Sequence, residues 1–426
     1  MSESAPRPNP VRGVAPASSA AAPDAAGEPV APPTSPTRSS ALKVSIAALG
    51  VAFGDIGTSP LYAVRECFHG THAIAPTPGN VLGVLSLIFW SLTIIVSIKY
   101  GAYVLRADNK GEGGVLALMA LTSSSVGGAR ARFLLVALGV FGAALLYGDG
   151  VITPAITVLS AMEGLEIAAP RLHSAVLPLT VVTLVGLFAI QRRGSALLGA
   201  VFGPIMVVWF STLMALGVAS ILRNPEVLRA MLPSYGALFL MDNGLAGMAV
   251  LGAVFLVVTG SESLYADLGH FGRAPIRRAW FFLAFPALFA NYLGQGALII
   301  RDPTAAESPF YRLAPEWGVL ALVLLSTVAS VIASQALISG VYSMSRQGTM
   351  LGLFPRVNIR HTSAEERGQI YVPTINWMLM LATIWLVLSF RSSTNLAAAY
   401  GVAVTLTMLV STVFLFVLGC GRWGWG

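Results

Sequence analysis

Long apolar segments separated by short polar loops recur along the chain from about residue 43. An α-helix needs about 20 apolar residues to cross the hydrocarbon core of a bilayer, and each segment approaches or exceeds that length. Ten spans are predicted, at residues 43–65, 81–105, 132–161, 174–191, 195–222, 246–267, 277–300, 317–343, 372–390 and 394–419. The pattern therefore predicts an all-α polytopic membrane protein.

The first 41 residues have a different character. They are rich in Ala, Pro and Ser, with scattered charges and no apolar run. Such a segment cannot bury enough surface to offset the entropy of ordering, and it lacks the apolar centre of a signal peptide. We expect residues 1–41 to be a disordered cytoplasmic tail and residues 42–426 to be a transmembrane core.

Basic residues accumulate in alternate loops. With the N-terminus inside the cell, the inner loops and ends hold eighteen of the 26 Lys and Arg residues and the outer loops hold seven. Cytoplasmic loops carry such an excess, so both ends are predicted to be cytoplasmic, in a plasma membrane or a bacterial inner membrane. The same loops account for the net charge of +7, which would otherwise suggest a nucleic-acid partner.

The first and sixth spans are interrupted by residues that disfavour an unbroken helix. The first contains Gly54-Asp55, followed by Gly57 and Pro60, and the sixth contains the sequence TGSESLY from Thr259. At such a break, freed carbonyls, the Asp55 carboxylate and the nearby hydroxyls of Thr58, Ser59 and Tyr62 can converge on a dehydrated cation. A proline-kinked helix with a capping aspartate is the alternative.

Ten spans divide into two halves of five, residues 42–222 and 246–419, and an interrupted span opens each half. With an odd number of spans per half, the second half enters the membrane from the opposite side. The sequence thus predicts an inverted five-plus-five repeat with broken helices 1 and 6, which is typical of alternating-access transporters.

Three carboxylates lie clearly inside predicted spans, away from the span ends: those of Asp55, Asp149 and Glu262. None has a Lys or Arg within a helical turn, so each needs another acid, water, a proton or a bound cation as its partner. Thr153 shares a helix face with Asp149, and Thr259 shares one with Glu262. For each threonine, a hydrogen bond to its own helix is the alternative use.

The available ligands favour a hard cation. Zinc prefers His and Cys, but no histidine lies in the middle of a span, and Cys67 and Cys420 are far apart in the sequence. Carboxylate, hydroxyl and carbonyl oxygens suit hard ions. Three acids around one monovalent ion leave surplus negative charge, so at least one acid should hold a proton during part of a transport cycle.

Four segments resemble signatures of the KUP/HAK/KT potassium uptake family, in the amino acid, polyamine and organocation superfamily. They are GVAFGDIGTSPLY at 50–62, YVLRADNKGEGG at 103–114, LLYGDGVITPAITVLSAMEGLE at 145–166 and VTGSESLYADLGHFG at 258–272. The resemblance runs from about Leu42 to the end of the chain. It implies a secondary active transporter that imports potassium with protons by alternating access, with potassium and protons as substrates and no cofactor.

The resemblance also implies an ion site. The positions that match the family's potassium-binding residues are Asp55, Tyr62, Asp149, Thr153 and Thr259. Asp55 and Asp149 would give the ion its charged ligands. Glu262 is predicted to carry the coupled proton, because its neighbours Gly260, Ser261 and Ser263 leave a long side chain room to change partners.

The chain departs from the family at two places. Phe53 stands where the family usually has Tyr, and members usually continue beyond span 10 with two further spans and a cytoplasmic domain. On this comparison the chain is C-terminally short but includes the whole repeat core, and homodimer formation is left open.

Two other functions fit parts of the sequence. A transporter of the same fold could carry amino acids or metal cations. An intramembrane aspartyl protease could use Asp55 and Asp149, but it would leave Glu262 without a role, so an enzyme is not expected.

Overall fold

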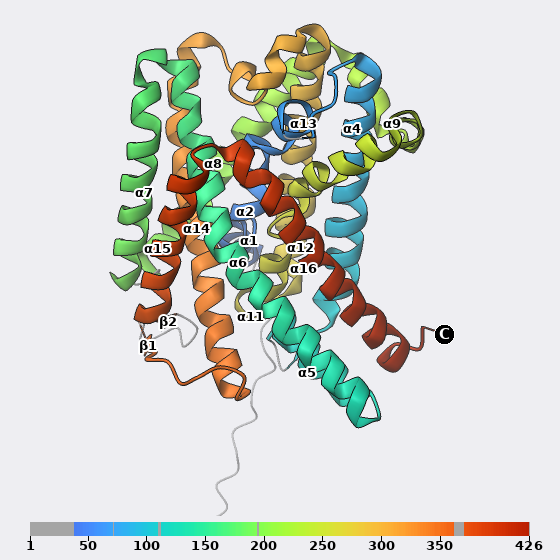
Figure 1. Ribbon diagram of the computed structural model, residues 1–426, viewed down its shortest axis with the longest axis vertical. Helices are drawn as coiled ribbons and strands as arrows, with labels where there is room; N and C mark the ends of the chain where they lie inside the picture. The colour runs from blue at the N-terminus through green and yellow to red at the C-terminus, as the bar shows by residue number, and fades with distance from the viewer. Residues whose placement is uncertain (1–37, 71, 110–111, 194–195, 362–369, 426) are drawn as a thin grey trace, which may run out of the picture. The chain divides into compact units, whose positions relative to one another are not determined.

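A computed structural model describes residues 38–70, 72–109, 112–193, 196–361 and 370–425, and these residues are almost entirely helical (Figure 1). The elements up to the middle of the chain are α1 (Arg38–Ala52), α2 (Gly54–Thr58), η1 (Ser59–Leu61), α3 (Ala63–His69), α4 (Pro78–Ser91), π-helical η2 (Leu92–Tyr103), η3 (Val104–Arg106), α5 (Val115–Ser125), α6 (Ala129–Ala168), η4 (Pro170–Ala175), α7 (Val176–Ile190), η5 (Gln191–Arg193), α8 (Ala196–Arg223) and η6 (Pro225–Met231).

The remaining elements are α9 (Pro233–Val254), η7 (Phe255–Val258), α10 (Ser261–Ala266), α11 (Leu268–Phe271), α12 (Arg273–Ala279), π-helical η8 (Trp280–Ala284), α13 (Phe285–Arg301), η9 (Pro303–Glu307), η10 (Tyr311–Leu313), η11 (Glu316–Gly318), α14 (Val319–Met350), β1 (Arg360–His361), β2 (Ile370–Tyr371), α15 (Pro373–Phe390) and α16 (Ser393–Arg422). The strands form one antiparallel ribbon in which Arg360 lies opposite Tyr371.

Within the described residues, nine helices are long and apolar enough to cross a membrane, and the bent pair Ala41–Ala52 and Gly54–His69 makes a tenth span. Most of these lie within a few residues of the predicted ranges. The prediction of a helical membrane protein with ten spans is therefore confirmed, when the bent pair is counted as one span.

Two parts of this architecture were not predicted. The sixth span was placed at 246–267, but its helix begins at Pro233 and turns at Gly244, whose φ of 51° and ψ of −124° are not helical. Proline favours the first turn of a helix, and glycine tolerates such a backbone, so both ends of this extra segment have local causes. The short helix α5 was also missed. The predicted tail falls mainly on residues 1–37, which lie outside the described residues.

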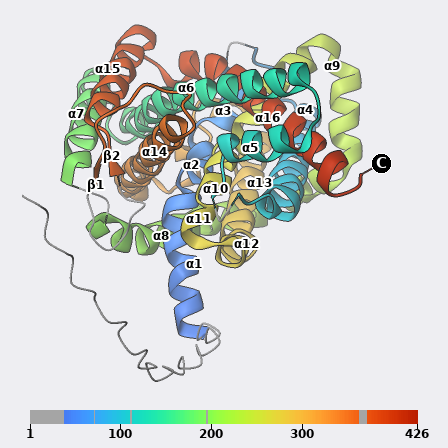
Figure 2. The same ribbon diagram turned by 90° about the horizontal axis from the view of Figure 1, so that it is seen from below.

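Four helix pairs organise the packing around the first span. Helix α1 packs on α8, α8 on α13, α6 on α14, and α16 on α6. Figures 1 and 2 show that α6 and α16 run side by side and that other helices surround α2. The broken part of the first span is therefore held in the interior, where α2 contacts α14.

Gly294 allows a close approach between α13 and α8. A Cβ atom added there would lie 2.5 Å from the Cα of Gly217, and the obstacle is backbone that cannot rotate away. We expect Gly294→Ala to lower the stability of the purified protein by about 1–3 kcal/mol, as overpacking does. Thermal unfolding in detergent would measure this. Gly186→Ala is the matched control, because a Cβ on that helical glycine meets nothing within 4 Å; equal melting temperatures for the two variants would contradict the expectation.

Candidate functional site

The first span is broken twice, on either side of Asp55 and its neighbours. Helix α1 ends at Ala52, and Phe53 has φ −112° and ψ 9°, outside the helical range. After α2 and η1, Tyr62 leaves the helix again with φ −131° and ψ −30°. The two parts of the span are bent by 67°. The prediction of a broken first span is confirmed.

The packing of α2 explains where its polar groups point. A Cβ on Gly54 would lie 2.9 Å from the Cα of Ala333, so α2 lies directly against α14. The hydroxyl of Thr58 donates to the Asp55 carbonyl at 2.8 Å, and that of Ser59 donates to the Ile56 carbonyl at 2.7 Å. Both hydroxyls thus donate to their own helix, and the Ser59 oxygen also lies 2.7 Å from the Tyr292 hydroxyl. That they could converge on an ion stays a prediction.

Asp55 is buried, with 3% of its surface exposed. Among the described residues, neither of its carboxylate oxygens has a hydrogen-bond partner. Gly260 packs against it: a Cβ at Gly260 would lie 2.9 Å from the Asp55 Cβ and 3.0 Å from Oδ2. A buried carboxylate without a partner is costly, so this side chain has the properties of a group that receives a cation or a proton.

The break in the sixth span is short and lies beside that in the first. After η7, Thr259 has an extended ψ of 148°, Gly260 has φ 79°, and α10 begins at Ser261. The Tyr62 and Thr259 hydroxyl oxygens are 3.4 Å apart. Two of the predicted site residues, from spans 1 and 6, are therefore in contact.

Helix α6 contributes a second carboxylate with a hydroxyl partner. Thr153 donates to Asp149 Oδ1 at 2.7 Å, as their spacing predicted, and its oxygen lies 2.6 Å from the Tyr400 hydroxyl of α16. The ring of Tyr400 lies 6.3 Å from that of Tyr62. Tyr400 therefore joins the two groups of predicted residues. Nothing local in the sequence distinguishes it, because its position depends on how α16 packs on α6.

Glu262 lies apart from these hydroxyls, in a different network. The Tyr100 hydroxyl donates to Glu262 Oε1 and lies 3.0 Å from Ser411 Oγ, to which Lys99 Nζ donates at 2.8 Å. Sequence reasoning missed Lys99, because it lies on another span. Its position within a long apolar segment was the signal that could have identified it.

A narrow cavity connects the two networks. Its lining comes from the break of span 6, from α6 and from α16: Asp149, Thr259, Gly260, Glu262, Ala403, Val404, Thr407 and Met408. Among the described residues, no group of three or more His, Cys, Asp or Glu gathers closely enough to hold a metal ion. Asp149 and Glu262 thus line the cavity, and Asp55 packs against its lining residue Gly260, so the three acids do not meet at one common point.

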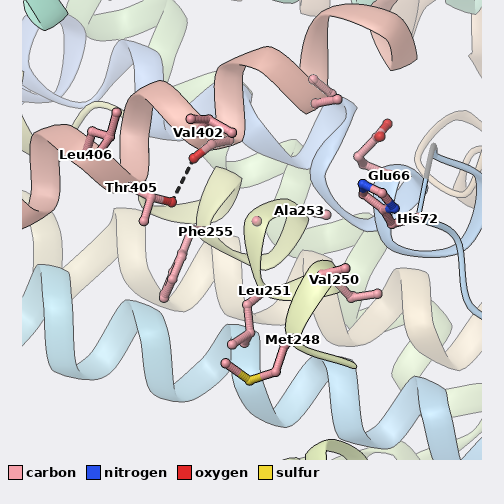
Figure 3. A pocket seen from close by; sticks show the side chains of 15 residues that line it. Glu66, His72, Met248, Val250, Leu251, Ala253, Phe255, Val402, Thr405 and Leu406 are labelled. Carbon is pink, nitrogen blue, oxygen red and sulfur yellow. Dashed lines mark hydrogen bonds between the residues drawn. The ribbon is translucent and has the colours of Figure 1, made fainter. Parts of the chain in front are cut away.

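A larger cavity lies between α9 and α16 and does not include this set of acids. Figure 3 shows mainly apolar side chains around it, with Glu66 and His72 at one end, and Thr405 bonded to the Gly401 carbonyl 2.7 Å away. Apolar walls offer no ligands to a dehydrated ion, so its size does not make it the candidate ion site.

An ion pair connects α3, α6 and α16 at some distance from the candidate site. Arg65 of α3 donates to Glu163 Oε2 of α6 at 2.6 Å, and Glu163 also accepts from the backbone nitrogen of Ser393 at 2.8 Å. Tyr62 immediately precedes α3, and Thr153 and Tyr400 lie on α6 and α16. The ion pair therefore holds together the same three elements that meet at the site.

Comparison with known proteins gives a consistent result. A family model described as "K+ potassium transporter integral membrane domain" matches residues 42–426. "Probable potassium transport system protein Kup" of Bdellovibrio bacteriovorus is 56% identical over 390 residues, which are 91% of this chain and 58% of that protein. "Probable potassium transport system protein Kup 1" of Geobacter sulfurreducens is 60% identical over 385 residues, 90% of this chain and 61% of that protein. A Kup protein of Anaeromyxobacter sp. is 54% identical over 427 residues, 96% of this chain and 64% of that protein. The chain thus spans about three fifths of the length of these relatives.

Proposed function

Because the chain belongs to the K+ potassium transporter family, we propose that it imports potassium together with protons by alternating access. The predicted resemblance to the KUP/HAK/KT family is confirmed, as is its membrane class. Membership of a transporter family leaves the protease alternative without support.

The observation that carries the proposal is the environment of Asp55. Its buried carboxylate has no hydrogen-bond partner among the described residues, and it lies where the breaks of spans 1 and 6 meet. A cation bound there would gain the full attraction of a charge shielded from water. Tyr62 and Thr259 would add hydroxyl oxygens, while Asp149 and Thr153 would add ligands from α6.

The chemistry of these ligands suits potassium better than the alternatives. They are carboxylate and hydroxyl oxygens, which hard cations prefer, and His and Cys do not contribute to the cavity lining. An amino-acid substrate would bring its own carboxylate next to Asp55, Asp149 and Glu262, and like charges would repel it. The relatives are named as potassium transport proteins, which agrees with this preference.

Glu262 is proposed to carry the proton. It lines the same cavity as Asp149, but its hydrogen bond is with Tyr100 rather than with the hydroxyls of the ion site. A carboxyl group in that place can sense the charge of a bound ion without being its ligand. Proton and potassium occupancy would then be coupled through electrostatic repulsion and attraction across the cavity.

Alternating access requires that the two sides of the site open in turn. We propose that both ends are cytoplasmic and that the two halves, 42–222 and 246–419, are inverted repeats. In this orientation the ion pair of Arg65 with Glu163 lies on the external side. It ties together α3, α6 and α16, so it would have to separate before potassium could enter from outside. On the other side, the Tyr265 hydroxyl donates to the Ala107 carbonyl and ties α10 to the inner end of span 2.

Ion uptake tests the proposal directly. This chain and a full-length relative would be expressed side by side in cells that lack their own potassium uptake systems. We expect both to restore growth at low potassium and to take up more potassium as external pH falls. If the chain reaches the membrane but gives no uptake while the relative does, the proposal is wrong for this chain.

A further inference from the structure

Lys99 is a basic residue next to the candidate site, in the same hydrogen-bond network as Glu262. It lies in the π-helical η2, and its ammonium group donates to the Met408 carbonyl at 2.9 Å and to Ser411 Oγ at 2.8 Å, both on α16. The ammonium nitrogen also lies 4.9 Å from the centre of the Tyr100 ring, a cation–π distance. Lys99 is therefore fixed in place rather than extended toward a membrane surface.

The hydrogen bonds of this cluster lead from Lys99 to Glu262. Ser411 Oγ accepts from Lys99 and lies 3.0 Å from the Tyr100 hydroxyl, which donates to Glu262. An ammonium group can only donate, so the first bond has a fixed direction. The Ser411 hydroxyl hydrogen has two acceptors within reach, the Met408 carbonyl and the Tyr100 oxygen, each 3.0 Å away. When Ser411 donates to Tyr100 and Tyr100 donates to Glu262, the chain of donors suits an ionised carboxylate.

The charge of Lys99 also favours the ionised form of Glu262, as the hydrogen bonds do. Lys99 and Glu262 attract each other, whereas Asp149 of α6 repels Glu262. Among the described residues, the charged and titratable groups that interact with Glu262 are Lys99 and Tyr100 of η2, Asp149 of α6 and Tyr265 of α10. From α16 the contact comes from Ser411, which does not titrate. Lys99 is the positive member of this set.

Resting on the proposed coupling role of Glu262, we infer that Lys99 is a positioning residue for proton coupling. Its fixed positive charge, together with Ser411 and Tyr100, stabilises the ionised form of Glu262 and thereby sets the pH range over which potassium uptake responds to protons. Lys99 does not itself line the cavity, and its one bond to a lining residue is to the Met408 carbonyl, which is not among the proposed potassium ligands. Its effect is therefore on the proton and not on the affinity for potassium.

Removing the charge should move the pH dependence. In Lys99→Met, ionised Glu262 loses its attractive partner, so it takes up a proton at higher pH. We expect the midpoint of potassium uptake against external pH to rise by about one unit, a tenfold change in proton affinity, since an opposite charge nearby has an effect of at least this size. Lys99→Arg should keep the wild-type midpoint. Lys43→Met, which removes an exposed lysine of α1, is the matched control.

A second readout separates this inference from the proposed function. The infrared carbonyl band of protonated Glu262, identified by its absence in Glu262→Gln, would be titrated in purified wild type and Lys99→Met. A band that appears at higher pH in Lys99→Met supports the inference, even if the protein transports nothing. An identical titration in the two proteins overturns it, whether or not uptake is seen.

The double variant completes the test. In a Glu262→Gln background, Lys99→Met should have no further effect on the pH profile, because the group on which Lys99 acts is absent. A shift of the same size in both backgrounds would show that Lys99 acts elsewhere and would overturn the inference. If Glu262→Gln alone keeps the wild-type pH profile, the coupling role of Glu262 fails, and the infrared titration still decides whether Lys99 controls its protonation.

Discussion

Replacing Asp55 with asparagine is expected to reduce the apparent affinity for potassium by about a thousandfold. The side chain keeps its size but loses its charge. Two unit charges about 4 Å apart attract by about 4 kcal/mol when the effective dielectric constant is about 20, and each 1.4 kcal/mol is a factor of about ten. Potassium uptake over a range of concentrations, and the potassium-dependent rise in melting temperature of the purified protein, would measure the loss.

The same substitution at an exposed position provides the control. Asp242 lies exposed on α9, so Asp242→Asn removes an equal charge without touching the cavity. We expect this variant to bind potassium as the wild type does. Asp55→Asn is also expected to remain folded, because a neutral amide costs less than a carboxylate to bury without a partner. Wild-type potassium affinity in Asp55→Asn would remove Asp55 from the ion site.

The sequence predicted those features of the fold that depend on local composition. Apolar length placed the spans, and Gly54, Gly57 and Pro60 predicted a broken span 1, in which the bend of 67° lies at Phe53, just before these residues. The spacing of Asp149 and Thr153 correctly placed them in hydrogen-bond contact, because four residues make about one helical turn. The roles assigned to these residues remain proposals.

Features that depend on packing between distant spans could not be predicted in the same way. The hydroxyls of Thr58 and Ser59 were considered as possible ion ligands, and the structure shows that each donates to a carbonyl of its own helix, which is the commoner use of such hydroxyls. Tyr400 meets Thr153 only because α16 crosses α6. Lys99 and Tyr100 meet Ser411 from a π-helix, whose side-chain spacing differs from the 3.6-residue period assumed for every span.

The different surroundings of the three acids support the different roles that we propose for them. Asp55 is buried without a hydrogen-bond partner among the described residues, Asp149 is bonded to Thr153, and the hydrogen bond to Glu262 comes from Tyr100. The Tyr100 hydroxyl can reorient when the Glu262 carboxyl group gains a proton. A cation bound at Asp55 is less readily replaced by a proton. We therefore assign the proton to Glu262, which lines the cavity and is linked through Tyr100 and Ser411 to Lys99.

Replacing Glu262 with glutamine is expected to abolish the pH dependence of uptake while leaving potassium binding largely intact. Glutamine resembles the protonated acid in shape and charge and cannot release a proton. The Tyr100 hydroxyl can still donate to its amide oxygen, so the local packing should be kept. Because the proposed ligands Asp55, Tyr62 and Thr259 are unchanged, potassium should still raise the melting temperature of the variant.

The measurement is potassium uptake at a series of external pH values, with Glu316→Gln, which changes an exposed glutamate of η11, as the control. In the wild type and the control, uptake should increase as pH falls, as proposed for an ion that enters together with a proton. In Glu262→Gln, the residual uptake should be the same at every pH and driven by the potassium gradient alone. If the variant keeps its full response to protons, the coupled proton is carried by Asp149 or Asp55 instead. The same pH series on Asp149→Asn distinguishes between them. A flat profile in that variant would assign the proton to Asp149, the carboxyl group bonded to Thr153.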